Sequence, residues 1–293
     1  MGRLKIVYPV CCGMDVHRDF LIACIATTNA QGVTEYQSRR FSTYTGSLRE
    51  LRDWLLANDC KDVCMESTGK YWFPVHNILE ESCHVVVSHP KFVKAIKGKK
   101  TDKKDAQWIA DLFKHDLVRG SFIPPKDIRQ LRDLCRYWVK LSSYMTGEKN
   151  RAQNCLTVSN FKLDDVFSNV FGKSASAITT QLLEHPGEQF DVAPFVDGRC
   201  KTPIAQIQEA VDGIFTYEQA EKLKIIRGHM DSLERHKAEL ESLILEIAQN
   251  YLPQIELLLT VPGIHDAFTA IRILAEIGAD MTVFDTSKHL CSW

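Results

Sequence analysis

The chain has 293 residues, 45% of them hydrophobic and 25% charged, which is the composition of a globular protein with a sizeable core. Its formal net charge is only −1, which excludes a uniformly basic nucleic-acid coat and leaves local patches as the source of any nucleic-acid contact. It has no run of about 18 apolar residues and no signal-peptide layout, so we expect a cytoplasmic protein that is neither membrane-spanning nor secreted.

The ten cysteines predict reduced thiols. None of them forms a C-x-x-C pair, the spacing that is typical of zinc ligands and of redox sites. Several lie inside apolar runs, where cysteine behaves as a small hydrophobic residue. This pattern is typical of a protein of the reducing cytoplasm.

The first part of the chain predicts strands followed by a helix. Residues 6–16 form an apolar run that is rich in strand formers and includes Asp15 near its end. Residues 20–28 and 33–42 continue the strand pattern after short turn signals, which predicts an antiparallel meander. Leucines at helical spacing then predict a helix over residues 47–57.

Strands and helices alternate after the meander. A short strand over residues 62–66 ends on Glu66, a helix follows over residues 71–81, and residues 84–89 form a buried strand. In open α/β sheets, functional groups collect at strand ends. Glu66 and Asp15 follow apolar residues at such ends, where a charge needs a partner, so both are candidate site residues.

Lysines crowd around two acidic residues in the segment from Lys91 to Asp111. The pattern becomes helical from Asp102, which puts Asp102 and Asp105 on the same side of a first helical turn. The lysines create a local positive field that suits the backbone of a nucleic acid. The candidate nucleic-acid contacts are Lys97, Lys99, Lys100, Lys103 and Lys104. The alternative is an acidic helix start, capped by Thr101 or Asp102, beside a solvated lysine loop.

These observations suggest a constellation of carboxylates: Asp15, Glu66, Asp102 and Asp105. Carboxylates that gather in one place repel one another, and a divalent cation relieves that repulsion. Mg²⁺, or Mn²⁺ in its place, takes oxygen ligands, and a pair of such ions about 4 Å apart can clamp a phosphoryl displacement. The alternative is that the acids are unrelated surface or capping residues.

Three sequence blocks resemble the acidic blocks of the IS110-type transposases. They are GMDVHRDF at 13–20, MESTGKYW at 65–72 and KTDKKDAQWIADL at 100–112. They stand in the family's order at plausible spacing, and the resemblance covers most of the chain. It implies a RuvC-like domain of the ribonuclease H fold over residues 1–123, which fits the predicted order of strands and helices.

The resemblance also carries expectations about chemistry and partners. It implies that Asp15, Glu66, Asp102 and Asp105 are the family's DEDD acids, catalytic and metal-binding at once. It further implies DNA as substrate, a guide RNA encoded by the element, and dimers that pair into tetramers. Composition and spacing alone support only a metal-dependent enzyme of phosphodiester chemistry.

A helical region is predicted over residues 124–254, after Pro124 and Pro125 break the chain. Heptad patterns begin at Ile128 and Leu223, which indicates either an intramolecular hairpin or partner chains. The resemblance favours a coiled-coil oligomerisation element. Basic residues of the first helix are further candidates for nucleic-acid contact: Arg129, Arg132, Arg136, Lys140, Lys149 and Arg151. Residues 157–215 predict short helices and loops without an assigned chemistry.

Residues 255–293 form the last block. A helix, a Val-Pro-Gly turn and a second helix resemble a helix-hairpin-helix, and a plain helical hairpin is the alternative. In the family this block starts the carboxy-terminal transposase domain, which continues into a segment with a nucleophilic serine. We expect the chain to be truncated before that segment.

The sequence therefore predicts a DNA transposase or site-specific recombinase of an insertion sequence. One alternative is a Mg²⁺-dependent nuclease of the Holliday-junction resolvase type, which needs the four acids and no serine. The other is an inactive remnant of a transposon that binds nucleic acid and oligomerises.

Overall fold

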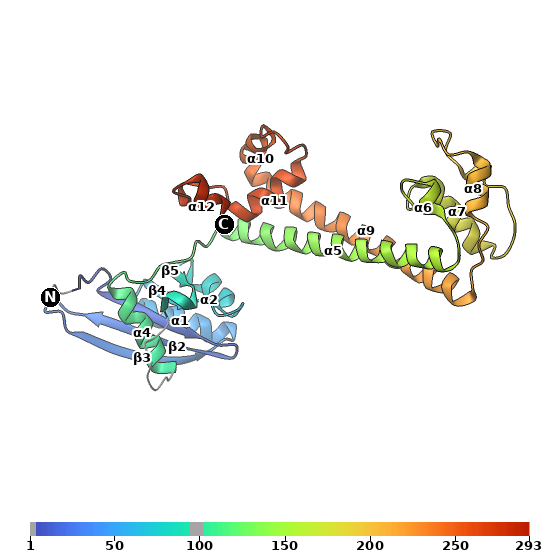
Figure 1. The fold of residues 1–293 in the computed structure, drawn as a ribbon. Helices are drawn as coiled ribbons and strands as arrows, with labels where there is room; N and C mark the ends of the chain where they lie inside the picture. The colour runs from blue at the N-terminus through green and yellow to red at the C-terminus, as the bar shows by residue number, and fades with distance from the viewer. Residues whose placement is uncertain (1–3, 94–101, 293) are drawn as a thin grey trace. The chain divides into compact units, whose positions relative to one another are not determined.

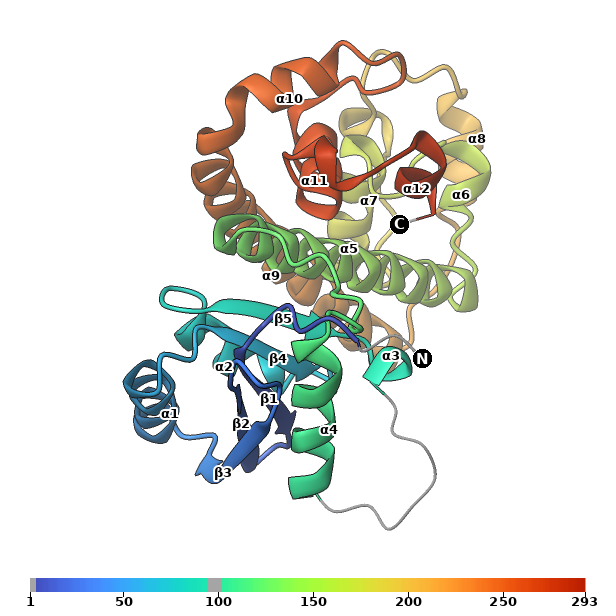
Figure 2. The ribbon, with the colours of Figure 1, turned by 90° about the vertical axis from the view of Figure 1, so that its left-hand side faces the viewer.

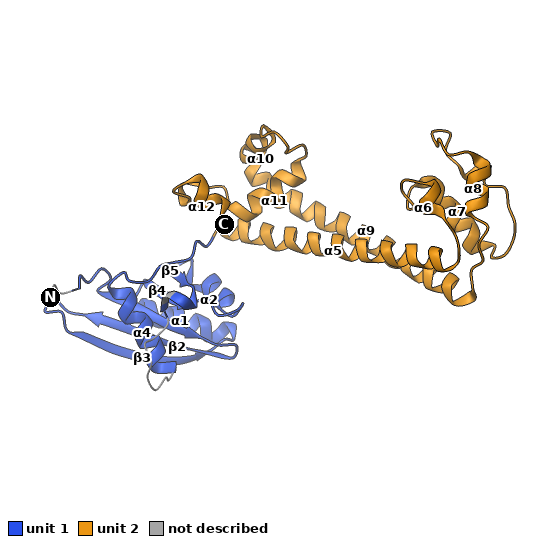
Figure 3. Cartoon of the chain, viewed as in Figure 1, with its two compact units in different colours: residues 1–123 blue, residues 124–293 orange. Residues whose placement is uncertain are grey.

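The computed structural model describes residues 4–93 and 102–292. The chain divides into two compact units, residues 1–123 and 124–293 (Figure 3). Among the described residues, no helix combines the length and the apolar character that a membrane crossing needs. All ten cysteines lie among the described residues, and all have free thiols, as the sequence predicts.

Unit 1 is built on a mixed sheet with the strand order β3-β2-β1-β4-β5 (Figure 1). The strands β1, β2 and β3 form an antiparallel meander, and β4 and β5 run parallel to β1. Their bounds are β1 Val10–Val16, β2 Phe20–Thr28, β3 Thr34–Ser42, β4 Asp62–Glu66 and β5 His84–Ser88. The α/β class with a ribonuclease H-like order of elements is confirmed.

Helices cover both faces of the sheet (Figure 2). The helices α1 (Thr45–Ala57) and α2 (Trp72–Leu79) pack on one face, and α4 (Asp102–Lys114) packs on the other. Side chains alternate along a strand, so β1 sends Met14 toward α1 and α2 and Cys11 toward α4. A short helix, α3 (Pro90–Val93), follows β5.

The first strand is shorter than the sequence predicts. It begins at Val10, not at residue 6, because Pro9 has no backbone N–H to donate to a neighbouring strand. The backbone N–H groups of Val7 and Tyr8 instead donate to the carbonyl of Lys114, at 2.8 and 3.1 Å. The chain before β1 therefore secures the end of α4.

Helix α4 rests its backbone directly on β1 at Gly13. A Cβ atom at this position would lie 2.3 Å from the carbonyl oxygen of Ala106 and 2.3 Å from the backbone nitrogen of Ala110. Both alanines are fully buried. At the far end of α4, the Lys114 ammonium bonds to Asp111 (2.7 Å) and Tyr36 (3.1 Å). The helix is thus held against the sheet in the middle and at its end.

Unit 2 is built on a long helical hairpin of α5 (Lys126–Val158) and α9 (Tyr217–Ala248). Trp138 of α5 donates to Glu241 of α9, and Glu148, further along α5, contacts His229, which comes before Glu241 on α9. The two helices are therefore antiparallel. The buried seam coincides in most places with the predicted heptads; it includes Ile128, Leu131, Cys135, Leu141, Leu233, Leu240, Ile244 and Ala248. Of the two alternatives from the sequence, the hairpin within one chain is the one observed.

The segment that joins α5 to α9 folds into short helices with a hydrophobic core of their own. They are α6 (Leu163–Val166), α7 (Lys173–Glu184), the 3₁₀ helix η1 (Ala193–Phe195) and α8 (Ile204–Ala210). Phe161, Ile178 and Ile207 are buried at the centre of this core, together with residues of α5 and α9. The segment is therefore a compact helical cap on the hairpin.

The last helices are η2 (Gln249–Tyr251), α10 (Leu252–Leu259), α11 (Ala267–Ile277), η3 (Met281–Val283) and α12 (Ser287–Cys291). Among them, α11 packs on α5, and α10 packs on α11. Arg132 donates to the carbonyls of Ala275 and Glu276 at the end of α11, and Arg136 forms two hydrogen bonds to the Glu276 carboxylate. These arginines, candidates for nucleic-acid contact from sequence, hold α11 to α5.

The contact at Gly13 predicts a specific sensitivity of unit 1. Gly13→Ala should lower the free energy of unfolding by about 1–3 kcal/mol, because the added methyl group overlaps the backbone of α4. Gly46→Ala is the matched control, since its Cβ meets nothing within 4 Å in the exposed first turn of α1. It should be neutral or stabilising by up to about 1 kcal/mol. Urea unfolding of both variants measures this, and equal effects would contradict the packing account.

Candidate metal centre

Asp15 and His17 project to the same side of the sheet at the end of β1. They are two residues apart, and side chains repeat with that period along a strand. His17 begins the tight turn into β2, where its backbone N–H donates to the carbonyl of Phe20 at 2.9 Å. The Nε2 atom of His17 lies 3.2 Å from Oδ2 of Asp15.

Asp102 reaches the same place from α4. It lies one helical turn before Ala106, whose carbonyl meets Gly13, so the packing of α4 brings the start of the helix toward Asp15. Oδ1 of Asp102 is 3.9 Å from Nε2 of His17. One ligand atom from each of Asp15, His17 and Asp102 lies within 4.8 Å of the others.

Glu66 and Asp105, also predicted from the sequence, lie outside this group of three. Glu66 ends β4 beside Asp15, because the parallel register pairs Met14 with Met65 just before them. Its carboxylate accepts a hydrogen bond from Thr68 at 3.0 Å. Asp105 is half-buried on the next part of α4 and is close enough to Asp15 to perturb it electrostatically.

The electrostatics of Asp15 show a site that favours positive charge. Partial burial raises the pKa of the Asp15 carboxyl above its ordinary value, and the negative charges of Asp102 and Asp105 raise it further. His17 opposes this rise through its charge and its hydrogen bond. A cation that bound at this place would relieve both the burial cost and the repulsion.

The donor set fits a hard or borderline divalent ion. Carboxylate oxygens suit Mg²⁺ and Mn²⁺, and an imidazole nitrogen is accepted more readily by Mn²⁺ and the later first-row metals. Asp15 is 16% exposed and Asp102 is 51% exposed, so an ion held here would face a substrate from solution. The residues present therefore fit a divalent ion.

The lysines predicted to contact nucleic acid are only partly described. Lys103 and Lys104 are exposed in the first turn of α4, next to Asp102. Lys97, Lys99 and Lys100 lie outside the described residues. The two described lysines place positive charge beside the carboxylates.

His17 was not among the residues predicted from the sequence. The signal was available in the Asp-x-His spacing at a strand end, because alternate residues of a strand share one face. The missing information was that α4 covers this face and brings Asp102 to within reach of the ring.

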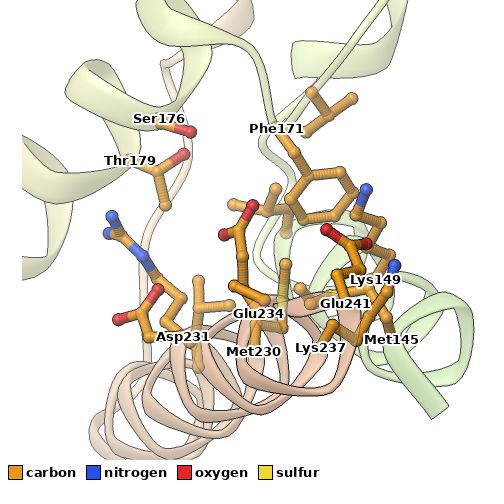
Figure 4. A pocket seen from close by; sticks show the side chains of 16 residues that line it. Met145, Lys149, Phe171, Ser176, Thr179, Met230, Asp231, Glu234, Lys237 and Glu241 are labelled. Carbon is orange, nitrogen blue, oxygen red and sulfur yellow. The ribbon is translucent and has the colours of Figure 1, made fainter. Parts of the chain in front are cut away.

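A concavity of about 510 Å³ lies in unit 2 between the hairpin and the helical cap (Figure 4). Its charged lining is balanced between three basic and three acidic residues: Lys149, Arg227, Lys237, Asp231, Glu234 and Glu241. Arg227 is engaged with Thr180 at 2.8 Å, and Glu241 accepts from Trp138 at 2.7 Å. This lining provides no excess charge for a metal ion or a phosphate.

The family model of the IS110-type DEDD proteins, described as a transposase, matches residues 12–160. No curated protein matches the chain. Among solved structures, Thermus thermophilus RuvC is 13% identical, with a TM-score of 0.32 over 38% of this chain and 99% of that one. Its complex with a Holliday junction substrate is 12% identical, with a TM-score of 0.29 over the same shares. The Fowlpox virus resolvase in complex with Holliday junction DNA is 14% identical, with a TM-score of 0.24 over 36% and 72%.

The raised pKa of Asp15 predicts how the metal-free protein responds to loss of this charge. The folded state binds a proton on Asp15 more readily than the unfolded chain, so stability falls as the pH rises from 3.8 through the raised pKa. Asp15→Asn should therefore raise the melting temperature at neutral pH without metal. Mg²⁺ or Mn²⁺ should stabilise the unmodified protein, by about 2.7 kcal/mol at a hundred times its dissociation constant, and not the variant.

Asp19→Asn is the control for this experiment, because Asp19 lies in the same turn but is 72% exposed and paired with Arg18. Its response to metal should equal that of the unmodified protein. Calorimetry with and without each ion measures the difference. Metal stabilisation that survives Asp15→Asn would contradict the assignment of the centre.

Proposed function

The chain belongs to the IS110-type DEDD transposase family, and from this premise we propose that it is a metal-dependent transposase or recombinase that cuts and transfers DNA strands. The observation that supports this most is the convergence of Asp15, His17 and Asp102 within 4.8 Å, with a family acid from β1 and another from α4. Chemistry on a phosphodiester requires that the developing negative charge be neutralised. Among the described residues, Asp15, His17 and Asp102 form the group with metal-ligand spacing.

In the proposed mechanism, Asp15 and Asp102 hold a divalent ion, Mg²⁺ or Mn²⁺, at the end of β1. The bound ion supplies Lewis acidity toward the scissile phosphate and a more acidic water. Asp15 fixes the position because its strand is covered on both faces, whereas Asp102 is exposed and able to adjust to the substrate. Lys103 and Lys104 attract the DNA backbone toward the carboxylates.

Glu66 and Asp105 complete the site in this proposal. Asp105 lies on α4 together with Asp102, and Glu66 ends β4, the strand that pairs with the strand of Asp15. Together with Asp15 and Asp102 they would supply enough oxygen atoms to hold a second divalent ion. The hydrogen bond from Thr68 engages one Glu66 oxygen and leaves the other available.

We further propose that the protein works in the cytoplasm as an oligomer with a guide RNA, as the family resemblance implies. Residues 124–254 would be the oligomerisation region, and 255–293 the start of the carboxy-terminal transposase domain. The oligomer rests on the resemblance, and α9 also carries singly exposed apolar side chains, including Ile225 (74%) and Leu243 (51%). The guide RNA rests on the resemblance alone.

The proposed function predicts metal-dependent cleavage. The full 293-residue chain should nick branched or duplex DNA in Mg²⁺, and Asp102→Ala should slow this at least a hundredfold, about 3 kcal/mol of lost transition-state stabilisation. Asp53→Asn is the control, because Asp53 is exposed on α1 and pairs with Arg52. DNA binding without cleavage in any divalent metal would instead favour the non-enzymatic remnant, and a strict requirement for branched DNA would favour the resolvase.

The lysines predict a salt dependence that is separate from catalysis. Lys103→Ala combined with Lys104→Ala should weaken DNA binding by a similar factor for all sequences, and lower the slope of log K against log salt by about 1–2. Lys61→Ala is the matched control, since Lys61 is exposed just before β4, at the opposite end of that strand from Glu66. Fluorescence anisotropy at several salt concentrations measures the slope. An unchanged slope in the double variant would remove these lysines from the interface.

A further inference from the structure

His17 lies between two carboxylates in a way that the family's four acids do not explain. Its Nε2 atom is 3.2 Å from Asp15 and 3.9 Å from Asp102, so a single imidazole nitrogen faces an acid from β1 and an acid from α4. The side chain is 40% exposed, so burial does not force it into this position.

The imidazole ring is held in place from its other side. Phe20 packs against it with ring centroids 4.7 Å apart, and the guanidinium of Arg40 lies over the Phe20 ring at 4.0 Å. The turn hydrogen bond between the His17 N–H and the Phe20 carbonyl fixes the backbone. A ring held in this way loses little rotational freedom when it binds a ligand.

The spacing of the atoms fits neighbouring positions around one ion. With metal–ligand distances of about 2.1 Å, adjacent ligands of an octahedral ion lie about 3 Å apart and opposite ligands about 4.2 Å apart. Nε2 of His17 lies 3.2 Å from Oδ2 of Asp15, which is near the spacing of adjacent ligands. It lies 3.9 Å from Oδ1 of Asp102, which is between the spacings of adjacent and opposite ligands. Small side-chain movements would bring all three atoms onto one ion.

We propose that Nε2 of His17 is a direct ligand of the divalent ion, and that it gives the centre a preference for Mn²⁺ and other first-row transition metals over Mg²⁺. Mg²⁺ favours an all-oxygen shell, whereas imidazole suits the transition metals, so exchanging an oxygen for a nitrogen ligand shifts selectivity. This inference rests on the proposed metal-dependent function. The inference adds one ligand, His17, and a metal preference to that proposed function.

The same sheet contains a matched comparison. His84 and Asp62 form another histidine–aspartate pair, with Nδ1 and Oδ1 2.9 Å apart, at the opposite end of β4 from Glu66. In the part of the chain that the structure describes, this pair has no third metal-ligating group, whereas His17 and Asp15 have Asp102. His84→Gln is therefore the control that removes an imidazole next to a carboxylate without touching the centre.

The experiment uses the full chain with Mn²⁺ alone as the probe, at one fixed pH above neutrality. Electron spin echo modulation detects a nitrogen bound directly to Mn²⁺, and it is independent of catalytic activity. We expect a nitrogen signal in the unmodified protein and in His84→Gln, and its loss in His17→Gln. Calorimetric titration should show Mn²⁺ affinity lowered at least about tenfold in His17→Gln, with a smaller change for Mg²⁺.

The outcomes separate this inference from the proposed function. Mn²⁺ that binds in an Asp15-dependent manner without a nitrogen signal would overturn the role of His17 and leave the metal centre intact. A nitrogen signal that persists in His17→Gln would also overturn it. If no Mn²⁺ binds, or binding survives Asp15→Asn, the centre itself is refuted and the inference with it. Circular dichroism melting of each variant confirms that it is folded.

Discussion

The direct contact between the backbone of α4 and Gly13 of β1 is the constraint on which the candidate centre depends. The absence of a side chain at Gly13 allows Ala106 and Ala110 to meet the strand, and this sets the depth of the helix over the sheet. Its first turn then carries Asp102 to the end of β1. The Lys114 carbonyl and ammonium secure the other end of the helix, so Asp102 extends from a firmly supported element.

Two effects disfavour the charged form of Asp15 at the candidate centre, and a bound cation would relieve both. Partial burial disfavours the charged form of Asp15, and the neighbouring acids Asp102 and Asp105 add repulsion. His17 offsets part of this through its charge and its hydrogen bond to Asp15, and Asp102 lies 3.9 Å from the same ring nitrogen.

In unit 2, basic residues that suggest nucleic-acid contact in the sequence instead stabilise the packing of helices. Arg132 and Arg136 complete the carboxyl end of α11 and pair with Glu276, where the helix dipole and the carboxylate both favour a cation. The concavity beside the helical cap balances its charges in the same manner. Among the described lysines proposed from sequence, Lys103 and Lys104 lie beside Asp102 in the first turn of α4, and we propose them as DNA contacts.

Local pattern was enough to predict much of unit 1, because alternation and helical spacing are properties of short segments. It located all five strands of the sheet, the start of α4 at Asp102, and the heptad seam that became the α5–α9 hairpin. It also named Asp15 and Asp102, since a charge after an apolar strand or in a first helical turn is visible in sequence. It placed the start of β1 too early, because the partner of Val7 and Tyr8 is the distant Lys114.

Only the tertiary structure decided which groups meet. The approach of α4 to Gly13 joins Asp102 to Asp15 and His17 across more than 80 residues of sequence, and it leaves Glu66 and Asp105 at the margin of the group. The same holds for Arg132, whose partners at the end of α11 lie more than 140 residues away. Contacts of this kind depend on how whole elements pack, and no local pattern of residues contains that information.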